Sequence, residues 1–365
     1  MAERQNLQGR YGTPIHRKRA VREALDALQG SRRAILTTHL NADGDGVGCQ
    51  VALAAWMRAL GGRPHIVNPT AFPDLFRFLL PEKGWVLEAS SAAAREACAE
   101  ADLAVVLDTG EMPRIGRVKP MIEDIRTVVI DHHQPGGQPI GGTSFRDANA
   151  CATGELVYDL VLASGGPWSR ATQDGIYVAI LTDTGSFRFS NATPSAHRIA
   201  ADLIADGVDP EGLHRRVYGA APERRLRLLA KALNTLEVDA TAGVAWMVVP
   251  HQLEGTEPLA EDVEGLVDYP RSVEGVEVGL LFRRTANGGT KISFRSTGAV
   301  DVNALARLFG GGGHVKASGA LVEGLPADVI SGVVEATRRA VRAAGGYPSP
   351  HSSLDSPQEK AARDE

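Results

Sequence analysis

Residues 33–62, RAILTTHLNADGDGVGCQVALAAWMRALGG, give the strongest indication of the fold. This stretch begins with a short apolar run, passes through a loop of glycines and acidic residues, and continues as a longer apolar segment that ends at a glycine pair. A short apolar run bounded by turn residues is typical of a strand, and a longer one with a terminal glycine is typical of a helix. The sequence therefore predicts a strand, a loop and a helix in succession.

The same alternation of short and long apolar segments continues along the chain. Further strands are predicted in HIVNP (65–69), ADLAVVLD (101–108) and RTVVIDHH (126–133), and helices in KRAVREALDAL (18–28), ELVYDLVLAS (155–164) and TQDGIYVAILTD (172–183). Strands that alternate with helices imply a parallel sheet with right-handed crossovers. We therefore predict an α/β fold with a doubly wound, mostly parallel sheet over residues 18–213.

A second, smaller α/β domain is predicted over residues 238–344. Its strands are GVAWMVVP (243–250), VEVGLLFRR (276–284) and TKISFRS (290–296), the last two joined as a hairpin through 286–289, and its helices are VNALARLF (302–309) and PADVISGVVEATRRAVRAA (326–344). The remaining segments are predicted to be a flexible polar arm (1–17), a linker helix with a basic face (214–237) and a disordered tail rich in proline and serine (345–365).

Charge and composition exclude several classes of protein. The net charge of -5 argues against a protein that grips long duplex nucleic acid through many phosphate contacts. No apolar stretch approaches the roughly 20 residues that span a bilayer, and the N-terminus lacks the hydrophobic region of a secretory signal. Cys49, Cys98 and Cys151 lack the spacing of a zinc site, and we interpret them as packing residues. We therefore expect a cytoplasmic protein that contacts no membrane.

Four clusters of acidic residues and histidines each follow an apolar run. They contain His39, Asp43 and Asp45 in THLNADGDGVG, Asp108 in VVLDTG, Asp131, His132 and His133 in VVIDHH, and Asp183 in AILTDTG. Because the carboxyl ends of neighbouring parallel strands converge at one edge of a sheet, these residues can form one site there. Gly44, Gly46 and Gly48 are expected to allow a sharply turned loop. The clusters together predict a metal centre.

Other interpretations of the single motifs are weaker. In a glycine-rich dinucleotide-binding loop, the carboxylate of Asp45 would repel the pyrophosphate. A calcium-binding EF-hand needs further ligands downstream. Asp108 alone could equally be a helix N-cap. A hydrolase with two metal ions, however, needs a shared carboxylate with terminal ligands on each side, and this sequence can supply that set. Of His132 and His133, one can bind metal while the other faces the substrate.

The combination of motifs resembles a known family. The triplet Asp131-His132-His133, with HLNADGDGVG upstream and TDTGSFRFS downstream, resembles the DHH phosphoesterase superfamily. GGGGHVKASG, residues 310–319, resembles the DHH-associated C-terminal domain. Within the superfamily the compact arrangement is most similar to the bifunctional oligoribonuclease and pAp phosphatase branch, also called nanoRNases, where pAp is 3′-phosphoadenosine 5′-phosphate.

That resemblance implies a dinuclear manganese site. His39 and Asp43 would hold the first ion, Asp45, His132 and Asp183 the second, and Asp108 would be shared between them. Asp131 would orient the motif without binding metal, and His133 would contact the scissile phosphate or the leaving oxygen. Carboxylates and imidazoles also suit Mn²⁺ on chemical grounds.

The glycine run of the second domain predicts substrate contacts. Consecutive glycine amides, here Gly311, Gly312 and Gly313, can form an anion-binding nest, and Arg295, His314 and Lys316 would add charge and donors. The resemblance implies that this domain holds the distal part of a nucleotide, so that the active site lies in the interdomain cleft. It also suggests a polar substrate contact at Asn303, although helix capping is an equal alternative. Arg188 could reach a substrate phosphate or order its own loop.

The functional hypothesis is a manganese-dependent phosphoesterase that degrades very short oligoribonucleotides to mononucleotides and removes the 3′-phosphate of pAp. A phosphodiesterase of cyclic or linear dinucleotides from the same superfamily is one alternative, and a non-catalytic nucleotide-binding regulator is another. All six predicted metal ligands are present, which disfavours the regulator. The substrate preference and the oligomeric state are left open, a homodimer included.

Overall fold

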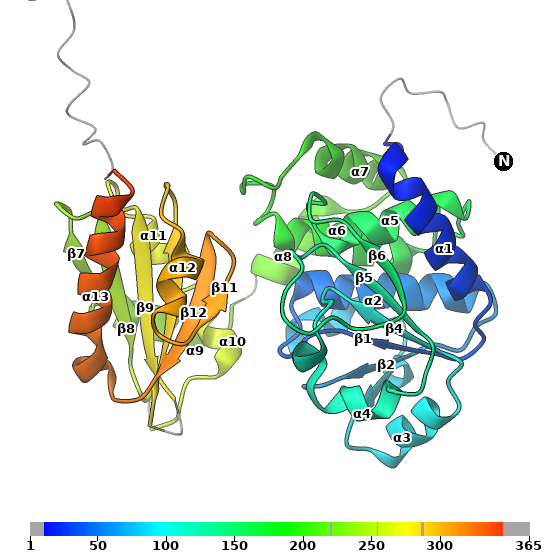
Figure 1. Cartoon of the computed structure of the whole chain (residues 1–365), viewed down its shortest axis with the longest axis horizontal. Coiled ribbons are helices and arrows are strands. Elements are labelled where there is room, and N and C mark those ends of the chain that lie inside the picture. The colour runs from blue at the N-terminus through cyan, green and yellow to red at the C-terminus, as the bar shows by residue number, and fades with distance from the viewer. Residues whose placement is uncertain (1–10, 220, 254, 286–287, 346–365) are drawn as a thin grey trace, which may run out of the picture. The chain divides into compact units, whose positions relative to one another are not determined.

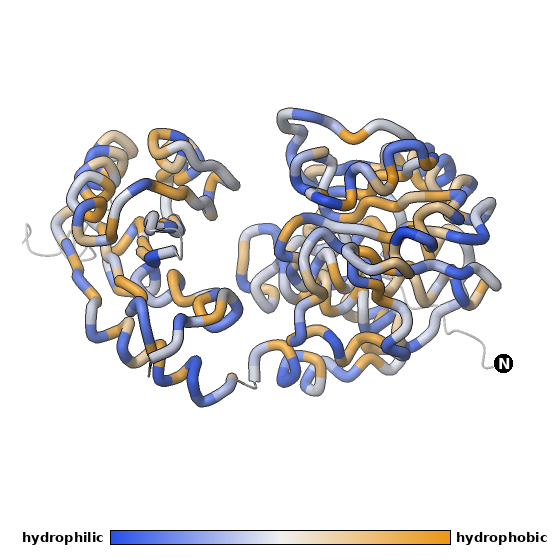
Figure 2. The backbone as a smooth tube through the Cα atoms, turned by 90° about the horizontal axis from the view of Figure 1, so that it is seen from below, coloured by the Kyte–Doolittle hydropathy of each residue, from blue (hydrophilic) through white to orange (hydrophobic). Residues whose placement is uncertain are grey.

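The computed structural model describes residues 11–219, 221–253, 255–285 and 288–345. The chain divides into two compact units at residues 220 and 221, each with its own sheet and hydrophobic core (Figure 1). Hydrophilic and hydrophobic stretches alternate along the backbone of both units (Figure 2). Among the described residues, no helix has both the length and the apolar character that crossing a membrane requires. All but the first residue of the predicted tail, 345–365, lies outside the described residues.

Six parallel strands form the sheet of the first unit, in the order β3-β2-β1-β4-β5-β6. They are β1 (Ala34–Thr37), β2 (His65–Asn68), β3 (Val86–Glu88), β4 (Leu103–Leu107), β5 (Thr127–Asp131) and β6 (Thr143–Arg146). This sheet confirms the predicted fold class. The two strands that were not predicted, β3 and β6, lie at the edges, where partial exposure removes the need for an apolar run.

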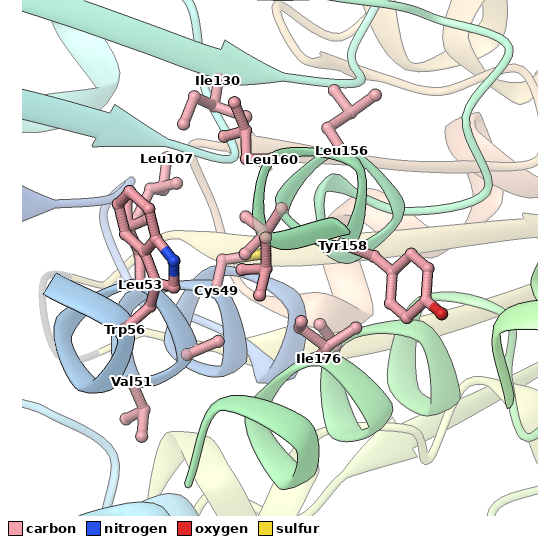
Figure 3. Close-up of a cluster of buried hydrophobic side chains, with 14 of the residues drawn as sticks. Cys49, Val51, Leu53, Trp56, Leu107, Ile130, Leu156, Tyr158, Leu160 and Ile176 are labelled. Carbon is pink, nitrogen blue, oxygen red and sulfur yellow. The ribbon is translucent and has the colours of Figure 1, made fainter. Parts of the chain in front are cut away.

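Helices cover both faces of this sheet. The α-helices are α1 (Lys18–Gln29), α2 (Gly44–Ala59), α3 (Ala92–Ala99), α4 (Lys119–Ile122), α5 (Thr153–Ala163), α6 (Arg170–Asp183), α7 (Pro194–Ala205) and α8 (Pro210–Tyr218), and the 3-10 helices are η1 (Ile15–Arg17), η2 (Asp74–Leu79), η3 (Lys83–Trp85) and η4 (Met112–Val118). On one face, Leu107 and Ile130 pack with Trp56 of α2 and Leu156 of α5 (Figure 3). On the other, alternate strand residues such as Val106 join α3, α4 and η4.

The glycines of the GDGVG motif have a different role from the one predicted. Helix α2 already begins at Gly44, so all three glycines are helical, and none has a positive φ. They are needed for close approach instead: a Cβ on Gly48 would lie 2.4 Å from the carbonyl oxygen of Gly175 in α6. A Cβ on Gly44 would meet Thr182 of the same helix. Gly44 and Gly48 therefore let α6 pack directly against α2, and Gly46 leaves room for the Thr38 side chain.

The prediction of a flexible arm over residues 1–17 is wrong for the last seven of them. Tyr11 and Arg17 are buried, and Arg17 pairs with Asp147, Glu155 and Asp159. The polar composition of this segment indicates a loose arm. Its sequence does not reveal the partners of the arginine, because those carboxylates lie more than a hundred residues away. Residues 1–10 lie outside the described residues.

The segment 214–237, predicted as one linker helix, contains the end of one helix and the whole of another. Helix α8 belongs to the first unit, and α9 (Glu223–Leu233) belongs to the second. Leu228 of α9 is fully buried against Met247 and Val249. Helix α9 is therefore a packed element of the second unit.

The second unit is built around a mixed sheet of order β11-β12-β10-β9-β8-β7. Its strands are β7 (Glu237–Asp239), β8 (Val244–Val249), β9 (Val278–Arg284), β10 (Thr290–Ser296), β11 (Gly312–Gly313) and β12 (Ala317–Val322), and its further helices are α10 (Ala260–Val263), α11 (Asp268–Arg271), α12 (Val302–Arg307) and α13 (Pro326–Ala343). Helices α12 and α13 pack on one face of the sheet, and α9 packs on the other. Strands β9 and β10 pair antiparallel as expected of a hairpin, although turn residues 286 and 287 lie outside the described residues.

Candidate metal centre

The predicted ligands gather at the carboxyl edge of the first sheet, but they arrive there from two kinds of element. His39 follows β1, Asp108 follows β4, and His132 follows β5. Asp43 and Asp45 belong to the start of α2, where Asp43 is the N-cap and accepts a hydrogen bond from the Gly46 amide. Asp183 is the last residue of α6, which agrees with the helix predicted over residues 172–183. It reaches the site because α6 packs along α2.

One group of potential ligands contains His39, Asp43 and Asp108. Nε2 of His39 lies 3.2 Å from Oδ2 of Asp108 and 3.6 Å from Oδ2 of Asp43. The other ring nitrogen, Nδ1, lies 2.9 Å from the carbonyl oxygen of Leu40, to which it can donate. That contact leaves Nε2 as the ligand atom, which is how metal-binding histidines are usually oriented. Burial opposes protonation of the ring, but hydrogen bonds to Asp108 and Asp43 raise the pKa of His39 to about 10.

A second group contains Asp45, His132 and Asp183. Nε2 of His132 lies 3.7 Å from one carboxylate oxygen of each of Asp45, Asp108 and Asp183. Its Nδ1 lies 3.3 Å from the carbonyl oxygen of Ala150. Both histidines therefore direct Nε2 at the carboxylates and Nδ1 at a backbone acceptor.

Asp108 stands between the two groups. One of its oxygens faces His39, and the other lies 3.7 Å from His132 and accepts a hydrogen bond of 2.9 Å from the Thr153 hydroxyl. Its backbone has a φ of 60°, a left-handed conformation that a non-glycine residue seldom adopts. Such strain is concentrated at functional sites, and here it turns the side chain into the site directly after β4.

The charges of the site fit a divalent cation. Asp45 is fully buried, and burial together with repulsion from Asp108 and Asp183 raises its pKa well above the usual value. Burial and the same crowding raise the pKa of Asp183 to about 6. Four carboxylates in so small a volume repel one another unless positive charge is added. With two correctly oriented imidazoles beside them, they form a donor set suited to a divalent metal ion.

His133 is held by a different partner. Its Nδ1 lies 2.8 Å from Oδ1 of Asp131, and its backbone amide donates to the same oxygen. Arg146 donates to the other oxygen of Asp131 at 2.7 Å. Burial alone would raise the pKa of Asp131, but the hydrogen bonds from His133 and the nearby Arg146 hold it below the usual value. A third group of potential ligands joins His133 to Asp108 and His132, with Nδ1 of His133 3.6 Å from Oδ1 of Asp108. Asp131 lies outside all three groups and orients His133.

Several residues that support the site were not predicted. The amides of Thr153 and Gly154, at the start of α5, donate to the two oxygens of Asp45 at 2.6 and 2.9 Å. Asn191 donates to Asp183, and Arg146 holds Asp131. No local pattern distinguishes these residues, because most of their contribution comes from backbone amides or from side chains that only the fold brings to the site.

The substrate-binding prediction for the second unit is partly corrected. Gly311 donates its amide to Ala306, Gly313 donates to Oδ1 of Asn303, and His314 donates to Ala317. These amides are engaged within the unit, so they do not form the predicted anion-binding nest, and Gly312 is paired with β12. Asn303 is not the helix cap, since Asp301 caps α12; it ties that helix to the glycine run.

Arg295 and Arg188 differ in their surroundings. Among the described residues, no carboxylate lies within ion-pair distance of Arg295, which donates only to the carbonyl oxygen of Phe294. Burial lowers the pKa of Arg295. Arg188 is exposed and donates to the Gly185 carbonyl at 2.7 Å, which orders its own loop.

Comparison with known proteins agrees with this architecture. Residues 33–181 match the DHH family, N-terminal domain, and residues 248–343 match the DHHA1 domain. A parallel α/β sheet whose carboxyl edge gathers a DHH triplet and further acidic residues defines a class of phosphoesterases. The chain belongs to this class, the DHH family.

Relatives with similar sequences have names that are more specific than the family. The chain is 34% identical over 330 residues to the bifunctional oligoribonuclease and PAP phosphatase NrnA of Thermus thermophilus, covering 90% of this chain and 95% of the relative. It is 26% identical over 296 residues to the protein of the same name from Bacillus subtilis, covering 79% of this chain and 88% of that one. An exopolyphosphatase-related protein from Bacteroides fragilis has a similar structure, with a TM-score of 0.82, 25% identity, and coverage of 89% and 97%.

Proposed function

We propose that this chain is a metal-dependent phosphoesterase that degrades very short oligoribonucleotides to mononucleotides and removes the 3′-phosphate of pAp in the cytoplasm. The observation that carries the proposal is the pair of ligand groups that meet at Asp108. The names of the two relatives, which cover most of the chain, support the choice of substrates.

The proposed site holds two divalent ions, with Mn²⁺ as the native metal. His39 and Asp43 would hold one, Asp45, His132 and Asp183 the other, and Asp108 both. When bound, such a pair of ions neutralises the charge that develops on the phosphoryl oxygens during hydrolysis. Only a carboxylate can serve both positions with its two oxygens, which is the role that the position of Asp108 supports.

His133 is proposed to donate a proton to the leaving oxygen. Asp131 accepts from its Nδ1, and this contact fixes the orientation of the ring. Arg146 in turn fixes Asp131. This chain of contacts resembles the carboxylate-histidine pairs that orient general acids in other hydrolases.

The proposal predicts activities that depend on added metal. Purified protein treated with a chelator should release neither phosphate from pAp nor mononucleotides from a labelled ribodinucleotide, and Mn²⁺ should restore both reactions. Product release is measured by phosphate assay and by chromatography, with cyclic dinucleotides as a third substrate. Folded protein that is inactive on pAp and on the ribodinucleotide in Mn²⁺ would contradict the proposal, and activity on cyclic dinucleotides alone would replace it with the phosphodiesterase alternative.

Arg295 is proposed to bind a substrate phosphate, together with His314, which follows the glycine run. A partly buried guanidinium without a carboxylate partner can form charge-assisted hydrogen bonds with an anion. We expect Arg295→Ala to raise KM for pAp about tenfold or more, since a hydrogen bond to a charged group contributes roughly 1.5–3 kcal/mol, with kcat little changed. Arg284→Ala, an exposed arginine at the other end of the hairpin, is the control. Equal KM values for the two variants would show that Arg295 does not bind the substrate.

A further inference from the structure

Arg17 is a buried arginine in the segment that precedes α1, and the proposed reaction does not use it. Its side chain is only 4% exposed. Nε donates to Asp147 at 2.6 Å, and Nη1 donates to Glu155 at 2.7 Å and to Asp159 at 3.1 Å. A buried guanidinium with three carboxylates is a costly arrangement, and removing one partner leaves uncompensated buried charge.

The partners of Arg17 bracket one segment of the chain. Asp147 follows β6, and Glu155 lies in the first turn of α5, so Arg17 holds both ends of residues 147–155. Glu155 also accepts the Cys151 amide at 2.9 Å, which fixes the middle of the segment. The Asp147 amide donates to the carbonyl oxygen of Asp131 at the end of β5. The segment is thereby tied to the DHH triplet at one end.

The interior of the same segment supplies contacts to the candidate ligands. The Ala150 carbonyl faces Nδ1 of His132, and the Thr153 and Gly154 amides hold both oxygens of Asp45. The Thr153 hydroxyl donates to Asp108. One segment of nine residues thus orients three of the six ligands. Arg17 contacts both of its ends, and His16 contacts Asp147 alone, at 2.8 Å.

Neighbouring contacts anchor the residues around Arg17. The Tyr11 hydroxyl donates to Asp159 at 3.0 Å and lies 3.3 Å from Nη1 of Arg17. The Tyr11 amide donates to Asp202 of α7, and its ring packs edge-on against Tyr158 of α5. Residues 11–17 are therefore fastened to α5 and α7 independently of Arg17, so that loss of the guanidinium need not release the whole segment.

We propose that Arg17 is a positioning residue for the metal centre: it fixes the 147–155 segment, whose backbone and Thr153 hold Asp45, Asp108 and His132 in ligating positions. The inference rests on the proposed metal-dependent function. Partners that orient metal ligands affect metal affinity by roughly 10- to 100-fold. The effect of Arg17 should therefore appear in metal affinity before it appears in substrate binding.

The test compares Arg17→Lys and Asp147→Asn with Arg19→Ala in the full chain. Lysine keeps the charge but cannot contact both ends of the segment, and asparagine keeps the turn at 147 while removing the charge that faces Arg17 and His16. Arg19 forms an exposed ion pair with Glu23 and serves as the matched control. Mn²⁺ binding is measured by calorimetry without substrate, and thermal unfolding and the kinetics on pAp are measured alongside.

We expect the Kd for Mn²⁺ to rise at least about tenfold in Arg17→Lys and Asp147→Asn, with KM for pAp unchanged at saturating metal and the control like the wild type. A merely structural role would lower the unfolding temperature and leave the Kd of the folded protein unchanged, which would overturn the inference. If Arg17→Lys does not fold, Asp147→Asn decides alone, and a wild-type Kd in that variant contradicts it. A wild-type chain that binds no Mn²⁺ would overturn the proposed function itself, and this inference with it.

Discussion

Replacement of Asp108 by asparagine is expected to lower kcat/KM for pAp by about a thousandfold or more, even at saturating Mn²⁺. Asparagine has nearly the same shape, and its carbonyl oxygen can still accept from Thr153. It lacks the charge and the second carboxylate oxygen, however, and so cannot serve both ligand groups. Loss of a single preorganised electrostatic contact in an active site already costs roughly 100- to 1,000-fold in rate.

The control for Asp108→Asn is Asp74→Asn. Asp74 is exposed and pairs only with the exposed Arg77 among the contacts described, so its variant should keep the wild-type rate. Phosphate release from pAp is followed for both variants, together with their Mn²⁺ content after dialysis. A rate for Asp108→Asn within a few fold of the wild type would show that the two groups do not share this carboxylate.

Gly48→Ala is expected to destabilise the first unit by about 1–3 kcal/mol, although alanine is the better helix former. Its Cβ would lie 2.4 Å from the Gly175 carbonyl oxygen and 3.0 Å from the Ala179 amide, both of them backbone atoms of α6 that a side-chain rotation cannot move aside. Helices α2 and α6 would have to separate. Because these helices carry Asp45 and Asp183, the damage should extend to the metal centre.

Gly332→Ala is the same chemical change as Gly48→Ala, but it is expected to have the opposite effect on stability. Gly332 lies within α13 and is exposed, and a Cβ there would have nothing within 4 Å. Helix propensity should then stabilise the second unit by up to about 1 kcal/mol. Urea unfolding followed by circular dichroism measures both variants. If Gly48→Ala were at least as stable as the wild type, close packing would not be the reason for glycine at this position.

The sequence predicts the architecture of the first unit well because its central strands are buried on both faces. Such strands consist of uninterrupted apolar runs, and a polar residue after Leu107 or Ile130 marks the edge of the sheet. The same pattern also predicts which residues are candidate metal ligands. The edge strands β3 and β6 give no such pattern, since their residues are only partly buried.

What the sequence does not predict depends on contacts between distant segments. Gly44 and Gly48 of α2 suggest a turn when considered alone, and only the position of α6 reveals that they are packing contacts. Arg17 belongs to a polar N-terminal stretch, yet its carboxylate partners are more than 120 residues away. The glycine run at 310–313 suggests an anion-binding nest, but its amides find acceptors such as Ala306 and Asn303 within the second unit.

Two metal ions that share Asp108 can be observed by anomalous diffraction from crystals of the wild-type protein grown with Mn²⁺. We expect two anomalous peaks roughly 3.5–4 Å apart, one contacted by His39 and Asp43, the other by Asp45, His132 and Asp183, with one oxygen of Asp108 or both in contact with each. A single peak, or two peaks of which only one contacts Asp108, would contradict this arrangement.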